Sequence, residues 1–136
     1  TTAQITLTST DIADNALSIS NTMTLTTAGT ETGITETTGL ARKKVASASL
    51  ADLITVANTD VTAAKSAKVY IKNTSTATDK YGLIGIGDSS GTPIYIGRLY
   101  GGDWMLFPWD ANSGEDITLT MSDATETIIE YMVFFE

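Results

Sequence analysis

Hydrophobic and polar residues alternate one by one in two segments near the start of the chain. Ile5 and Leu7 alternate with Thr6 and Thr8. In the next segment the apolar side chains share one parity and Ser or Thr fills the other; the apolar positions are Leu17, Ile19, Met23 and Leu25. A period of two predicts β-strands that place one face in a core and the other in water.

The middle of the chain predicts a strand followed by a β-hairpin. Val69 and Ile71 alternate with Lys and Tyr residues. Residues 81–87 and 92–100 flank the turn sequence Asp88-Ser89-Ser90-Gly91. Two strand-like segments separated by a short turn of this composition are typical of a hairpin.

The last third of the chain predicts three more strands, over residues 104–107, 117–121 and 127–136. Pro108 ends the first of them, because proline cannot donate to a strand ladder. In the C-terminal segment the apolar residues from Ile128 to Phe135 occupy both parities. A strand that is apolar on both faces is usually buried on both. We therefore expect the C-terminal strand in the middle of the fold, with a core on one face and a second sheet or another chain on the other.

Residues 47–57 are compatible with a strand or a short helix. The helical alternative rests on apolar residues three and four positions apart, namely Leu50, Leu53, Ile54 and Ala57. Short apolar runs do not separate the two possibilities, and we favour a strand because the surrounding segments are all strand-like. Residues 27–39 are predicted to form a mobile loop, and a second loop is expected around residues 57–66.

These elements predict one all-β domain over residues 1–136, an antiparallel β-sandwich of jelly-roll or immunoglobulin-like type. The composition agrees, because 25 of the 136 residues are Thr, which favours strands. Residues 1–40 supply the Thr-rich strands and the mobile loop, and residues 67–136 the best-defined core strands. The order of the strands is not predicted.

The composition argues against catalysis. The chain contains neither Cys nor His, so thiolate chemistry, disulfides and the commonest general base are all missing. We expect no enzymatic activity. Two exposed Trp rings could still bind a sugar, so the positions of Trp104 and Trp109 are expected to distinguish a carbohydrate-binding module from an assembly protein.

Two motifs partly match known ligand-binding patterns, but each lacks a feature that binding requires. Residues 110–116 carry Asp110 and Asn112 at the spacing of a calcium loop, but its glycine is one place early and Met121 replaces the final acid. Residues 82–87 are Gly-rich, but no helix follows to bind a phosphate. We expect no metal and no cofactor, and explain the glycines by close approach of a neighbour, for example a Trp ring.

The charge distribution is uneven. The net charge is −8, yet residues 41–80 contain seven of the eight Lys and Arg side chains. An acidic chain is repelled by nucleic acid and by anionic membranes. The basic run Arg42-Lys43-Lys44 predicts either solvent-exposed strand positions opposite acids or a docking patch for an acidic partner.

Three further stretches are distinctive when taken together. They are Val69-Tyr70-Ile71-Lys72-Asn73-Thr74-Ser75, residues 97–109 from Gly97-Arg98-Leu99-Tyr100 to Phe107-Pro108-Trp109, and residues 129–136. Together they resemble stretches of small structural proteins of tailed bacteriophages, especially those of marine and cyanobacterial hosts. The resemblance covers the second half of the chain, and the Thr-rich first half is similar mainly in character.

This resemblance implies a virion structural protein. The first expectation is a capsid decoration (cement) protein on the capsid surface, made in the host cytoplasm. It is expected to be a homo-oligomer, with a trimer as the first choice, and to have the major capsid protein as its partner. The alternatives are a tail or fibre component, or a carbohydrate-binding β module that contacts the host. No nucleic acid, membrane or small-molecule substrate is expected as a partner.

Two sets of site residues follow from these expectations. The candidate contact with an acidic capsid shell consists of Arg42, Lys43, Lys44, Lys65 and Lys68. The candidate subunit-interface or core residues are Trp104, Phe107, Trp109, Tyr131, Val133 and Phe135.

Overall fold

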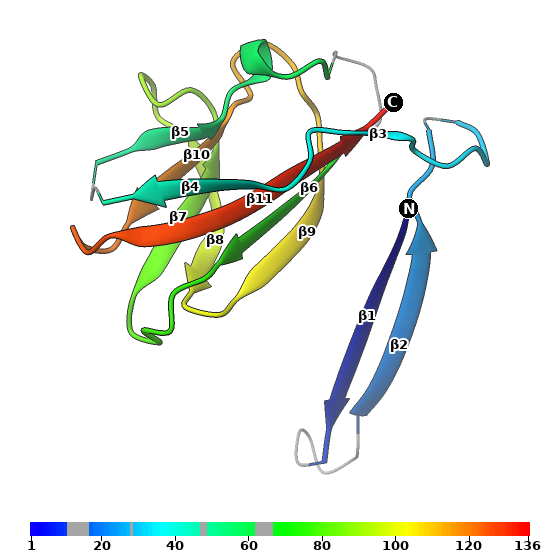
Figure 1. Ribbon diagram of the computed structural model, residues 1–136, viewed down its shortest axis with the longest axis horizontal. Helices are drawn as coiled ribbons and strands as arrows, with labels where there is room; N and C mark the ends of the chain where they lie inside the picture. The colour runs from blue at the N-terminus through cyan, green and yellow to red at the C-terminus, as the bar shows by residue number, and fades with distance from the viewer. Residues whose placement is uncertain (11–16, 28, 47–48, 62–66) are drawn as a thin grey trace.

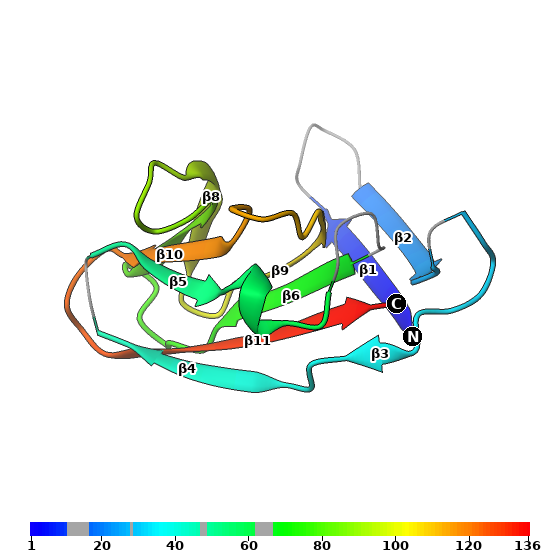
Figure 2. The same cartoon turned by 90° about the horizontal axis from the view of Figure 1, so that it is seen from above.

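The computed structural model describes residues 1–10, 17–27, 29–46, 49–61 and 67–136. Two antiparallel sheets pack face to face, and a separate hairpin extends from one end of them (Figures 1 and 2). This confirms the prediction of an all-β sandwich.

The strand order in the two sheets follows from their hydrogen-bonded registers. The first sheet is built around β11 and β6 and consists of β4 (Ala41–Val45), β11 (Thr127–Phe135), β6 (Ala67–Asn73) and β9 (Trp104–Trp109), with the short β3 (Glu36–Thr37) beside the end of β11. The second sheet has the order β5 (Ala51–Ile54), β10 (Ile117–Met121), β7 (Tyr81–Ile86) and β8 (Ile94–Tyr100).

Within the eight strands from β4 to β11, the first pairs with the last, the second with the second last, and so on inwards. β4 pairs with β11, β5 with β10, β6 with β9 and β7 with β8. This nested order is a jelly roll. An immunoglobulin-like sandwich instead keeps its first two strands in one sheet, whereas β4 and β5 lie in different sheets. The strand pairing therefore selects the first of the two topologies that the sequence left open.

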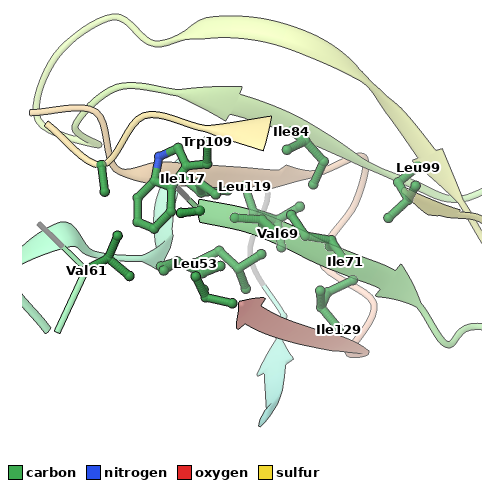
Figure 3. Packing of buried hydrophobic residues seen from close by; sticks show 14 of the residues in the cluster. Leu53, Val61, Val69, Ile71, Ile84, Leu99, Trp109, Ile117, Leu119 and Ile129 are labelled. Atoms are coloured by element: carbon green, nitrogen blue, oxygen red, sulfur yellow. The ribbon is translucent and has the colours of Figure 1, made fainter. Parts of the chain in front are cut away.

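The core lies between the two sheets and follows the predicted parity. Val69 and Ile71 of β6 and Ile129 and Val133 of β11 are completely buried. They pack with residues of the opposite sheet, among them Ile84, Ile117 and Leu119 (Figure 3). The C-terminal strand is central, as predicted, because β11 pairs with β6 on one edge and with β4 and β3 on the other. Only one of its faces is in the core, since the other points away from the sandwich.

The hairpin predicted over residues 81–100 is confirmed as β7 and β8, with the amide of Gly91 donating to the carbonyl of Asp88 at 3.0 Å. The glycines of β7 do allow a close approach, but by Leu119 and not by a Trp ring. A Cβ atom on Gly82 would lie 2.6 Å from Cδ1 of Leu119. Glycine at this position lets the buried leucine pack directly on the β7 backbone.

The uncertain segment around residues 47–57 contains a strand. β5 covers Ala51–Ile54 and is followed by a single 3-10 turn, η2 (Val56–Asn58). Residues 27–39 include β3 and a bridge between Thr26 and Gly33. Residues 47–48, and 62–66 of the second predicted loop, lie outside the described residues. In the described part of the chain, no helix is long and apolar enough to cross a bilayer.

The first two strands do not enter the sandwich. β1 (Thr2–Ser9) and β2 (Leu17–Thr24) pair with each other along their whole length and form a two-stranded sheet, here called the arm (Figure 1). The expectation that their apolar side chains lie in a core is wrong, because no second layer covers them. The root of the arm is fixed by buried Leu25, whose carbonyl accepts the amide of Ile34 at 2.7 Å.

Candidate functional site

The face of the first sheet that points away from the core is the candidate interaction surface, and we call it the outer sheet face. Its members are Arg42, Lys44, Lys68, Tyr70, Lys72, Trp104, Leu106, Pro108, Ile128, Glu130, Met132 and Phe134. Four strands contribute to it, because the side chains at every second position of a strand point to the same face of the sheet.

The registers arrange these side chains in rows across the sheet. One row runs from Arg42 through Glu130 and Lys72 to Trp104. The next contains Met132, Tyr70 and Leu106. The outer sheet face therefore has a basic end, formed by Arg42, Lys44 and Lys72, and a mainly apolar end, where Lys68 lies in the row of Phe134 and Pro108.

At the basic end, the charges of the cations are partly neutralised by one acid in β11 and by one acid directly before this strand. Arg42 donates from Nη2 to Oε1 of Glu130 at 2.7 Å and from Nε to the same oxygen at 2.8 Å. Lys44 forms an ion pair with Glu126. These basic side chains are about two-thirds exposed, so solvent screens both pairs and they contribute little to stability.

The predicted basic contact residues separate into three groups. Arg42, Lys44 and Lys68 belong to the outer sheet face, whereas Lys43 points the other way and donates from Nζ to the carbonyl of Asp52 in β5. Lys65 lies outside the described residues. The basic run is thus divided by strand alternation and does not form one patch.

Lys72 belongs to the same surface, although it is not among the candidate contact residues expected from the sequence. It lies between Glu130 and Trp104 in the register of β6. The sequence does contain a signal for it. Lys72 lies four residues after Lys68 in a strand whose intervening positions are apolar, so the two lysines point to the same face. Its proximity to Arg42 depends on β11 lying between β4 and β6, which no local pattern indicates.

The apolar end of the outer sheet face borders a groove of about 340 Å3. Its sheet side is formed by Leu40, Tyr70, Trp104, Leu106, Met132 and Phe134, and its other side by residues 1–5 and Leu25 at the root of the arm. No charged side chain lines it. The rings of Tyr70 and Trp104 lie with centroids 6.4 Å apart, and burial, with a smaller effect of Glu130, raises the pKa of Tyr70 above its ordinary value of 10.0.

The predicted interface or core residues are mostly core. Trp109, Val133 and Phe135 are buried, and Phe107 and Tyr131 pack against the core cluster. Trp109 donates from Nε1 to the carbonyl of Glu115 at 2.8 Å. Trp104 is half exposed on the opposite face of β9. The two Trp rings therefore do not form the paired platform that a sugar site would use.

Polar side chains of the acidic turn at residues 110–116 form hydrogen bonds with other groups of the chain. The side-chain amide of Asn112 donates to Asp110 at 2.6 Å, and Oδ1 of Asp116 accepts the amide of Val56 at 2.7 Å. Within the described ranges, no three acidic side chains are grouped closely enough to hold a metal ion.

No protein-family model matches this chain, and no curated protein matches it. The function that we propose therefore rests on the resemblance of the three sequence stretches and on the outer sheet face.

Proposed function

We propose that this protein is a structural component of a tailed-bacteriophage virion, a capsid decoration protein that attaches to the shell and stabilises it. The sequence resemblance of residues 69–75, 97–109 and 129–136 supports this assignment. The jelly roll is compatible with it, because the fold recurs in viral capsid domains. The fold alone does not specify function, since lectins share it.

The observation that carries the proposal is the charge of the outer sheet face. The molecule has a net charge of −8, yet this face contains half of its eight basic side chains: Arg42, Lys44, Lys68 and Lys72. Glu130 is the one acid among its strand positions. An acidic shell would attract this face and repel the remaining surface, which would orient the protein during attachment.

Binding to undecorated capsids tests the proposal. The double variant K44E/K72E reverses two charges on the outer sheet face, and we expect it to bind at least about tenfold more weakly. The control K43E/R98E makes the same change in net charge, but at Lys43, which points toward β5, and at Arg98 on β8. Equal loss of binding in both variants would contradict a contact through this face.

Electron microscopy of intact particles tests the location. A decoration protein gives density for this chain on the capsid surface. Density confined to the tail would refute the capsid assignment and favour a tail or fibre component. The carbohydrate-binding alternative has less support, because Trp104 and Trp109 lie on opposite faces of β9.

A further inference from the structure

The arm has one apolar face, and beyond the groove at its root none of the described residues covers this face. Its register places Leu7 opposite Ile19 and Ala3 opposite Met23 on this face, with Ile5 opposite Asn21 between them. The exposed fractions are 42% for Ile5, 51% for Leu7, 39% for Ile19 and 48% for Met23. The opposite face consists of pairs such as Thr6 with Ser20, whose hydroxyls suit water.

Such an arm is not expected to persist alone in water. A two-stranded hairpin is marginally stable unless its apolar face packs on something. A continuous row of exposed aliphatic side chains is also typical of an interaction site. The arm extends beyond both sheets (Figures 1 and 2), so its distal half has no surface of the sandwich to pack on.

The groove at the apolar end of the outer sheet face has matching chemistry. It is lined by uncharged residues, among them Tyr70, Leu106 and Phe134, and neither β1 nor β2 contains a charged residue. The root of the arm already forms one wall of this groove. A surface that accepts the proximal residues of an arm within one chain offers suitable packing for the arm of a neighbour.

We propose that the arm of one copy docks its apolar face into the groove of a second copy of this chain. Strands of eight residues are about 27 Å long and a pair of them is about 10 Å wide, so one arm face covers about 270 Å2. Two such contacts, counted on both partners, bury about 1,100 Å2, which meets the roughly 1,000 Å2 expected of a specific interface. Reciprocal exchange, in which each copy both donates an arm and accepts one, gives a dimer with these two contacts.

This self-association goes beyond attachment to a capsid and is tested in solution. The variant L7N/I19N removes one cross-strand apolar pair, and each substitution is expected to weaken association about tenfold. The control T6N/S20N changes the adjacent pair on the polar face of the arm. Sedimentation equilibrium measures association, and thermal unfolding verifies that the sandwich remains folded. A wild-type chain that stays monomeric at about 100 μM, or equal association of both variants, overturns the proposal.

The absence of Cys allows a direct test of the contact. L7C and L106C are purified separately, mixed and oxidised, and a disulfide between the two chains is expected. The control mixes L7C with I94C, because Ile94 is 77% exposed on β8 in the other sheet. Equal yields from both mixtures, or no product with L106C, contradict docking in the groove. A monomer whose L7N/I19N variant loses only capsid binding would identify the shell as the occupant and refute a second copy.

Discussion

At the scale of single residues, Asn73 shows how the sandwich accommodates a polar side chain at the end of β6. Asn73 is completely buried. Its side-chain amide donates to the carbonyl of Leu99 at 3.0 Å, and its side-chain oxygen accepts the amide of Ser75 at 3.0 Å. Because both groups are paired, burial costs little. The residue fixes the end of β6 to β8 of the facing sheet, within one of the stretches that resemble the bacteriophage proteins.

Tyr70 predicts a pH dependence of stability. Burial in the groove, followed by the charge of Glu130, raises the pKa of this phenol above 10.0. The native state therefore keeps the proton at pH values where the unfolded chain has lost it. Its contribution to the free energy of unfolding is complete below pH 10.0 and is lost as the pH rises through the raised pKa.

Urea unfolding of the wild type and of Y70F between about pH 9 and about pH 11 measures this contribution. The wild type should lose more stability than Y70F over this range, since Phe has no proton to lose. Identical slopes for the two proteins would show that Tyr70 titrates as it does in the unfolded chain.

Gly82 and Gly97 form a matched pair for a steric prediction. A Cβ on Gly82 would meet buried Leu119 at 2.6 Å, whereas a Cβ on Gly97 would have open space. We expect G82A to lower the free energy of unfolding by about 1–3 kcal/mol, because Leu119 has little room to move. G97A should be neutral or stabilising by up to about 1 kcal/mol. Chemical denaturation measures both, and equal effects would show that the core adjusts around Gly82.

At the scale of elements, β11 has two apolar faces with different environments. Ile129 is completely buried between the sheets, while its neighbour Ile128 is 45% exposed on the outer sheet face. The apolar residues at both parities thus lie in the core on one side and on the outer sheet face, the proposed interaction surface, on the other. Under that proposal, the strand carries more apolar residues than the core of one chain requires because its second face meets another molecule.

Substitution of these two neighbours separates the faces. I129A should destabilise the protein by about 2–5 kcal/mol, because it leaves a cavity in a packed core. I128A in the monomer should change the free energy of unfolding by about 0.5 kcal/mol or less. Denaturation at low protein concentration gives both values. A large effect of I128A there would mean that the outer sheet face is covered within the monomer.

At the scale of the whole molecule, the charges are separated between surfaces. The outer sheet face contains Arg42, Lys44, Lys68 and Lys72 with Glu130 as its one acid, which leaves four basic and fifteen acidic side chains on the rest of the chain. Attraction to an acidic surface through one face is thereby opposed by repulsion of the rest. This balance would make the proposed attachment sensitive to ionic strength, since both effects operate between exposed charges.

The effect of K44E/K72E on capsid binding should therefore depend on salt. The screening length falls from about 30 Å at 0.01 M to about 8 Å at 0.15 M ionic strength. We expect the ratio of the wild-type to the variant association constant to be largest at the lower ionic strength and to decrease as salt is added. Co-sedimentation with capsids over this range measures it. A ratio independent of salt would indicate that lost packing, and not lost charge, weakens binding.

The sequence by itself determined the strands and the direction of their side chains. Alternation with a period of two is a local property of an extended backbone, so β6, β10 and the hairpin of β7 and β8 could be predicted from neighbouring residues. The continuous apolar run of β11 likewise indicated its central place. The same local pattern assigned Lys68 and Lys72 to one face, although Lys72 was not recognised as part of the site.

Only the tertiary structure decided which strands meet. The jelly roll pairs β4 with β11, so that Arg42 faces Glu130 from 88 residues away, and no local pattern contains that information. The tertiary structure also decided the position of the arm: β1 and β2 have the alternation of core strands, but a period of two indicates only that one face is apolar. Whether that face meets its own core or another molecule depends on the surface available to cover it.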